Sequence, residues 1–108
     1  MTYSVLLTRD ADQDLEALYD YLYWHDSPES AGYVLDQIEQ ALNSLKEHPQ
    51  RGVYPKELAS VGIREYREIY FKPYRLIYRI LADKVYIMVI ADGRRDMQSL
   101  LQRRILNP

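Results

Sequence analysis

The sequence predicts an α+β fold in which a four-stranded antiparallel sheet is packed by an N-terminal helical hairpin. Three observations support this. Apolar residues recur at helical spacing through residues 10–46, and from Ile63 the period becomes two. Only short breaks separate the alternating segments, which is typical of antiparallel hairpins. We therefore expect the order β-α-α-β-β-β-α, with residues 1–108 forming a single domain.

The N-terminal elements follow from local patterns. Residues 3–7 alternate and predict a first strand. Thr8 or Asp10 is then placed to cap a helix with acids in its first turn, and this helix ends at His25. A second helix begins at Ser27-Pro28-Glu29, which supplies an N-cap, a proline for the first helical position and an acid. Two such helices form a hairpin that needs a sheet to cover its apolar face.

The second half of the chain predicts a meander and a final helix. Residues 49–62 hold two Pro, two Gly and no periodicity, so we expect a loop. Alternation then predicts three strands, at about 64–71, 74–82 and 84–91. Residues 97–106 predict a last helix that must dock on another element, because a helix this short is marginal alone.

Charge is divided unevenly along the chain. Residues 1–50 hold two basic and ten acidic residues, a balance of −8, whereas residues 51–108 hold twelve basic and six acidic ones, a balance of +6. Nine of the ten arginines lie in the second half. Arginine has a planar fork that suits phosphate or carboxylate. We expect two surfaces with different partners, one of them anionic; the alternative is that the two halves neutralise each other on folding.

Several classes of function lack support in the sequence. There is no cysteine, and the two histidines, His25 and His48, stand at helix ends, so we expect no metal site and no cofactor. No apolar run approaches the roughly 18 residues of a membrane span. The N-terminus turns acidic after one short apolar run, unlike a secretory signal. We therefore expect a cytoplasmic protein without a membrane partner.

Arginines on the expected sheet are the candidate functional residues. On the middle strand, residues 74, 76, 78 and 80 face the helices, and Arg75, Ile77, Arg79 and Leu81 face the other way. Arg75 could bind an anion or could be a structural partner of a carboxylate, for which the candidates are Glu65, Glu68 and Asp92. The spacing leaves both roles open for Arg75 and favours a structural role for Arg67 and Arg79.

The run GIREYREIYFKPYRLIYRILADKVYIMVIADGRRD, residues 62–96, resembles the ParE branch of the RelE/ParE superfamily of toxins from bacterial toxin–antitoxin systems. Earlier segments agree with this resemblance. YSVLLTRDADQDLEALYDYL is similar to the first strand and helix start of that family, and HPQRGVYP is similar to its P-x-x-G-x-x-P loop. The resemblance spans nearly the whole chain and implies the fold described above.

The resemblance implies one of two activities. RelE-like members cleave messenger RNA on the ribosome without a metal, holding the phosphate with basic residues and usually using a C-terminal tyrosine or histidine. ParE-like members inhibit DNA gyrase. Arg75 matches an arginine common to both branches, and Arg94 or Arg95 matches the basic position after the last strand. For a nuclease, the implied phosphate-binding set is Arg67, Arg75 and Arg95.

A departure from the nuclease pattern favours the ParE-like activity. After Asp96 the chain has no Tyr, His or Lys, and Asp92 stands where the family often has a histidine. Arginines alone can stabilise a phosphorane but cannot activate a 2′-hydroxyl. We expect a gyrase-inhibiting toxin of a plasmid-stabilisation type. The alternative is an mRNA endoribonuclease whose proton-transfer group would come from Tyr54, Tyr66, Tyr70, Glu68 or Asp92.

The resemblance also implies a partner, a cognate ParD-like antitoxin in a toxin–antitoxin hetero-oligomer. An acidic antitoxin would suit the basic half of the chain. The expected contact residues for target or antitoxin lie on the sheet and the last helix: Arg67, Arg75, Arg79, Ile77, Leu81, Arg94, Arg95, Leu100, Leu101, Arg103 and Arg104. We expect the last helix to be mobile, so that removing residues 97–108 abolishes toxicity and leaves a folded domain; the alternative is that this helix permanently covers the open face of the sheet.

Overall fold

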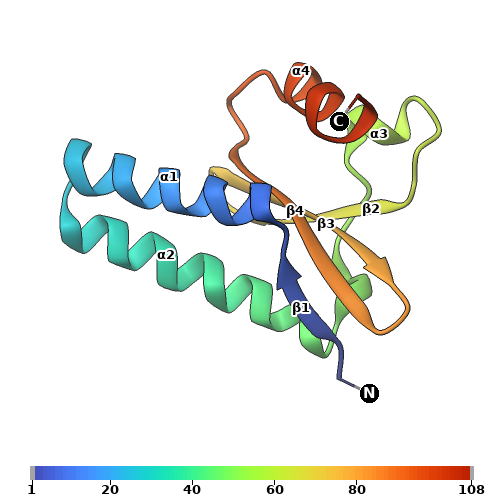
Figure 1. The fold of residues 1–108 in the computed structure, drawn as a ribbon, viewed down its shortest axis with the longest axis horizontal. Helices are drawn as coiled ribbons and strands as arrows, with labels where there is room; N and C mark the ends of the chain where they lie inside the picture. The colour runs from blue at the N-terminus through green and yellow to red at the C-terminus, as the bar shows by residue number, and fades with distance from the viewer. Residues whose placement is uncertain (1, 108) are drawn as a thin grey trace.

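The structure, a computed structural model, describes residues 2–107 as one four-stranded sheet with helices on both faces (Figure 1). The strands lie in the order β1-β4-β3-β2 and are β1 (Ser4–Leu7), β2 (Tyr66–Phe71), β3 (Tyr74–Leu81) and β4 (Lys84–Asp92). The helical elements are α1 (Arg9–His25), α2 (Pro28–Asn43), η1 (Ser44–Lys46), η2 (Pro49–Arg51), α3 (Lys56–Ala59), α4 (Met97–Leu101) and η3 (Gln102–Leu106).

The predicted α+β fold is confirmed, but the direction of the first strand differs from the prediction. β2, β3 and β4 form the expected antiparallel meander, whereas β1 pairs with β4 in parallel. The hairpin α1–α2 explains this, because its two helices run in opposite directions and return the chain to the start of β1. The Tyr3 amide there donates to the Lys46 carbonyl at 2.8 Å. β2 therefore runs in the same direction as β1. β3 runs in the opposite direction and β4 reverses it again, so β4 is parallel to β1.

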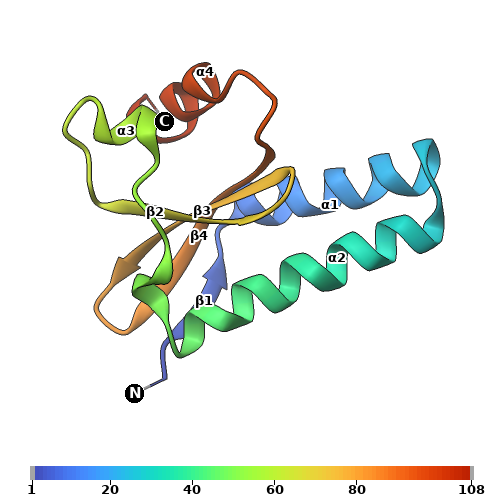
Figure 2. The same ribbon diagram turned by 180° about the vertical axis from the view of Figure 1, so that it is seen from behind.

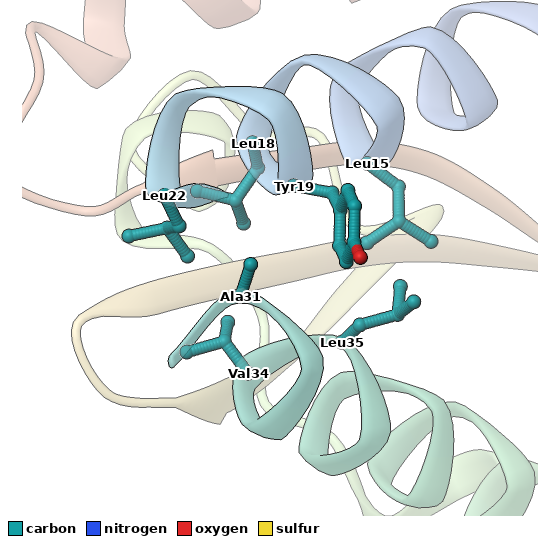
Figure 3. Close-up of a pocket in the computed structure, with 7 residues that line it drawn as sticks. All are labelled: Leu15, Leu18, Tyr19, Leu22, Ala31, Val34 and Leu35. Carbon is teal, nitrogen blue, oxygen red and sulfur yellow. The ribbon is translucent and has the colours of Figure 1, made fainter. Parts of the chain in front are cut away.

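Both predicted helix starts in the hairpin are present. The Thr8 hydroxyl accepts a hydrogen bond from the Ala11 amide at 3.2 Å, and the Ser27 hydroxyl accepts one from the Ser30 amide at 3.0 Å. Each cap satisfies an amide that has no partner within its helix. Figure 3 shows how α1 and α2 meet, with Leu15 and Leu22 of the first helix directed toward Leu35 and Ala31 of the second. The hairpin thus has an apolar interior of its own.

A main core fills the space between this hairpin and one face of the sheet. Alternate residues of β3, Leu76 and Tyr78, are fully buried there, as are Ile87 of β4 and Ile38 of α2. These are the positions that the period of two places beneath the helices. Burial of each such side chain stabilises the fold by roughly 1.5–3 kcal/mol.

A second core covers the opposite face of the sheet. Ile77 of β3 and Val89 of β4 are fully buried under α4, together with Leu58 of α3. The predicted loop 49–62 therefore contains a helical turn that contributes to a core. A register shift between Ile77 and Tyr78 marks a β-bulge in the β3–β4 pairing, which places Met88 and Val89 of β4 against this second core.

The view from behind shows the distribution of these elements (Figure 2). The α1–α2 hairpin extends well beyond the sheet, whereas α3 and α4 lie together on its other side. Among residues 2–107, no helix combines the length and the hydropathy that crossing a bilayer requires.

Candidate functional site

Arg75 lies at the centre of a charge cluster on the α3–α4 side of the sheet. Its Nε donates to Glu68 Oε1 at 2.7 Å, and its two terminal nitrogens donate to the two carboxylate oxygens of Glu57 at 2.9 and 2.8 Å. Arg75 is 8% exposed and Glu68 only 2%. A guanidinium bound by two carboxylates has little capacity left for another anion. The hydrogen bonds to Glu57 and Glu68 raise the pKa of Arg75 further above its usual range.

Tyr70 and Glu57 extend the cluster toward the surface. The Tyr70 hydroxyl donates to Glu68 Oε2 at 2.7 Å. Burial and this hydrogen bond to a carboxylate raise the pKa of Tyr70 to about 12. Hydrogen bonding to Arg75 lowers the pKa of Glu57. At neutral pH the tyrosine therefore keeps its proton, and Glu57 keeps its negative charge.

A cleft of about 500 Å³ opens over this cluster. Cations line its rim, namely Lys56, Lys72 and Arg94. Arg94 pairs with Asp92 at 2.6 Å and lowers the pKa of that carboxyl. At Gly93 a β-carbon would lie 2.9 Å from the Arg75 side chain, so glycine lets the chain pass closely over the cluster.

Arg67 and Arg79 do not join Arg75. Arg67 alternates with Glu68 along β2 and lies on the opposite face, where it donates to the Gly52 carbonyl at 2.9 Å. Its guanidinium also lies 4.8 Å above the Tyr54 ring. Arg79 lies 5.7 Å from the Tyr66 ring centre. Both arginines therefore make contacts within the chain, and the expected single surface of Arg67, Arg75 and Arg95 is not assembled.

The C-terminal arginines separate into one anchored and two exposed side chains. Arg104 binds both carboxylate oxygens of Asp14 in α1 at 3.0 and 2.9 Å and donates to the Met88 carbonyl at 2.9 Å. Arg95 and Arg103 are exposed. Asp14 also accepts a hydrogen bond from the Ile90 amide at 3.0 Å. The Asp14 carboxylate thus provides a hydrogen-bond partner for the Ile90 amide of β4, at a point where the pairing of β4 with β1 has ended.

Three apolar residues among the expected contacts are buried. Ile77 is fully buried, Leu100 is 5% exposed and Leu101 is 1% exposed. Ile77 was expected to be exposed and is not, because α4 packs on this face of the sheet, and a contact role for these residues stays a prediction. Leu81, at the far end of β3, is 45% exposed and remains available for a contact.

Glu57 is the site residue that sequence reasoning missed. Its segment reads as a loop by composition, yet Pro55-Lys56-Glu57 repeats the proline-then-acid order of a helix start, the signal that identified α2. Glu68 was among the candidate partners of Arg75 and is one of the two actual partners. In residues 2–107 no three His, Asp or Glu side chains converge as metal ligands would.

Solved structures place this architecture in the class of ParE and RelE toxin folds. A chain of the chromosomal ParDE toxin–antitoxin system of P. aeruginosa superposes with a TM-score of 0.69 at 22% identity, over 84% of this chain and 96% of that one. An E. coli RelE mutant in the free state superposes with a TM-score of 0.66 at 17% identity, over 97% of this chain and 99% of that one. A chain of the M. tuberculosis RelBE2 toxin–antitoxin complex superposes with a TM-score of 0.56 at 24% identity, over 85% of this chain and 92% of that one.

Sequence comparison narrows this class. The family model for the ParE toxin of the type II toxin–antitoxin system parDE matches residues 5–97. Toxin ParE3 of Caulobacter vibrioides is 26% identical over 100 residues, which are 93% of this chain and 96% of that protein. The chain belongs to the ParE toxin family of type II toxin–antitoxin systems.

Proposed function

We propose that the chain acts by inhibiting DNA gyrase and is neutralised by a cognate ParD-like antitoxin. The observation that carries the proposal is the state of Arg75. Glu57 and Glu68 occupy its guanidinium, so the arginine that the nuclease branch would direct at a phosphate is engaged within the chain. A surface that grips a protein or its cleaved DNA complex needs no proton-transfer group, only complementary charge.

Two of the five candidates for proton transfer, Tyr70 and Asp92, support the same choice. Tyr70, with a pKa raised to about 12, holds its proton at neutral pH and directs it at Glu68. Asp92, with a pKa lowered by Arg94, is a weaker base than an ordinary aspartate. Cleavage of RNA needs a group whose pKa lies near the working pH. Neither side chain meets that requirement.

An antitoxin partner is supported by the family and by the relatives. The neighbouring structures include a ParDE system and a RelBE2 complex, both toxin–antitoxin pairs by their descriptions. The exposed cations Arg95 and Arg103, with the rim of the cleft, offer the surface for an acidic antitoxin segment. Gyrase acts on DNA in the bacterial cytoplasm, so the proposal also places the chain there and assigns it a role in plasmid or chromosome stabilisation.

The test compares two reactions with one purified protein. We expect the chain to block supercoiling by gyrase and to accumulate cleaved DNA, while a translating extract keeps its messages intact. Arg94→Ala with Arg95→Ala should weaken inhibition, whereas Asp83→Asn, on the far β3–β4 turn, should not. Codon-positioned cuts in the message without any effect on gyrase would overturn the proposal.

A second candidate is a RelE-like mRNA endoribonuclease. It is favoured by the cleft itself, where Lys56, Lys72 and Arg94 surround a tyrosine–carboxylate pair. This activity requires Glu57 to leave Arg75 so that a phosphate takes its place. If cuts appear in the extract and are lost in Tyr70→Phe, this second function replaces the first.

A further inference from the structure

The free end of the α1–α2 hairpin exposes aromatic side chains that contribute little to the fold. Both ribbon views show this end extending past the sheet (Figures 1 and 2). Trp24 is 78% exposed, Tyr33 60% and Tyr21 59%. The aromatic residues of the sheet behave differently, since Tyr78 is fully buried. Exposed apolar side chains that adjoin one another, unlike singly exposed ones, indicate an interaction surface.

These rings are already arranged on one another. Tyr21 stacks on His25 with ring centres 4.3 Å apart and 16° between the planes. Tyr23 meets Trp24 edge-on, with ring centres 5.0 Å apart. Rings held in place by their neighbours lose little conformational freedom when a partner binds. The hairpin end is therefore a preformed surface that needs no rearrangement to be used.

The charge around this surface indicates what chemistry would bind it. Residues 10–45 contain nine acidic residues and neither Lys nor Arg. Within residues 2–107, two of these nine acidic residues, Asp10 and Asp14, form an ion pair, and both pair with Arg104. Both lie far from the hairpin end. Asp20, Asp26 and Glu29 accompany the exposed aromatic residues. A nucleic acid or an anionic membrane would be repelled here.

Aromatic faces beside carboxylates suit arginine. A guanidinium stacks on a ring while its edge reaches a carboxylate. The chain uses the first of these contacts twice internally, with Arg67 above Tyr54 at 4.8 Å and Arg79 above Tyr66 at 5.7 Å. The hairpin end presents the same acceptors, and its own residues, 10–45, include no Lys or Arg. Arg94 and Arg95 approach it at Tyr21, with which they line a cleft.

We propose that the hairpin end, defined by Tyr23 and Trp24 with Asp20 and Glu29, is a docking surface for an arginine-rich segment of a partner protein. Trp24 is its central contact. Tyr21 marks the boundary of this surface, because it lines a neighbouring cleft together with Arg94 and Arg95. This inference stands whether or not gyrase is the target.

The test uses a defined probe in place of the partner. A fluorescein-labelled, end-blocked peptide of six Arg-Ala repeats is titrated with the full chain at low ionic strength, and binding is followed by anisotropy. The matching Glu-Ala peptide is the charge control. Trp24 is the only tryptophan, so its emission reports directly on the surface in the wild-type chain. We expect the arginine peptide to bind and to change this emission.

Variants then locate the binding. Trp24→Ala should weaken binding about tenfold, in line with loss of an exposed cation–π contact and its packing. Asp20→Asn with Glu29→Gln should weaken it as well. Val61→Ala, another strongly exposed apolar position, and Asp83→Asn should leave it unchanged. Because Trp24 is mostly exposed, its variant should unfold at the wild-type temperature.

Three outcomes would overturn the proposal. They are no binding of the arginine peptide to the wild-type chain, equal binding of the glutamate peptide, or a Trp24→Ala variant that binds as the wild type does. A chain that binds the peptide at Trp24 but leaves gyrase active would instead refute the proposed function and keep this inference.

Discussion

Gly52 is a position where the local packing leaves no space for any side chain. Its amide donates to the Tyr78 hydroxyl at 3.1 Å, and that hydroxyl donates to the Pro49 carbonyl at 2.6 Å. A β-carbon on residue 52 would lie 2.5 Å from the Tyr78 oxygen and 2.7 Å from the Glu68 carbonyl oxygen. The segment before α3 is held against the sheet through this close approach.

We therefore expect Gly52→Ala to lower the free energy of unfolding by about 2 kcal/mol, because overpacking forces backbone and Tyr78 apart. Gly32 is the matched control. It lies inside α2 with no atom within 4 Å of an added β-carbon, so Gly32→Ala should stabilise the chain by about 0.5 kcal/mol. Urea unfolding of the wild type and the two variants measures both changes in the free energy of unfolding. Equal effects of the two substitutions would contradict this account.

The Arg75–Glu57 pair gives a prediction that depends on pH. Glu57→Gln should cost about 2 kcal/mol at neutral pH, as loss of charged hydrogen bonds does. Because Arg75 lowers the pKa of folded Glu57, the pair stabilises the fold fully above the usual glutamate value of 4.5 and less as the pH falls below it.

The unfolding free energies of wild type and Glu57→Gln should therefore become more similar as the pH falls from neutral toward pH 3, which is about one unit or more below the usual pKa of a glutamate side chain. Glu65→Gln, at an exposed carboxylate before β2, is the control and should change stability little at any pH. A difference that stays constant with pH would show that Glu57 acts through packing and not through its charge.

Among the elements, those defined by local sequence were predictable. The caps at Thr8 and Ser27 and the antiparallel meander follow from a few adjacent residues each. The direction of β1 was not predictable in that way, because it depends on a hairpin more than thirty residues long returning the chain. Glu57 was missed for the same reason, since its importance arises from Arg75, eighteen residues away in the sequence.

The C-terminal helix is the element whose role changes most with the structure. Met97, Leu100 and Leu101 cover Ile77 and Val89, so removing residues 97–108 would expose a core and cost about 5 kcal/mol or more. We therefore no longer expect the chain without residues 97–108 to remain folded. A milder change is needed to test whether α4 and η3 can open.

Arg104→Met is that change, because it removes the hydrogen bonds to Asp14 and to the Met88 carbonyl and keeps an unbranched, flexible side chain that still covers apolar surface. We expect hydrogen exchange at the Leu100 and Leu101 amides to accelerate, while the buried amides of β3 keep their protection. Arg103→Met, at the exposed neighbour, should leave exchange unchanged. Uniform acceleration through the whole chain would indicate global destabilisation and not local opening.

At the scale of the whole molecule, folding leaves the two charge populations separate. In residues 2–107, the ion pairs that join the acidic first half to the basic second half are those of Arg104 with Asp10 and Asp14. Mutual neutralisation therefore accounts for little of the division between −8 and +6. The molecule instead carries an acidic hairpin at one end and exposed cations around the cleft and C-terminus.

This separation predicts how an antitoxin would associate with the chain. If an acidic segment is drawn to the exposed cations, the association rate constant should fall about tenfold or more as salt rises from low to physiological levels, because screening shortens the range of attraction. Arg95→Ser with Arg103→Ser should lower the rate at low salt and flatten its salt dependence. Asp36→Asn with Glu39→Gln, on the acidic hairpin, should not lower it. Stopped-flow mixing with the proposed ParD-like antitoxin measures these rates, and a rate that is independent of salt would remove charge steering from the account.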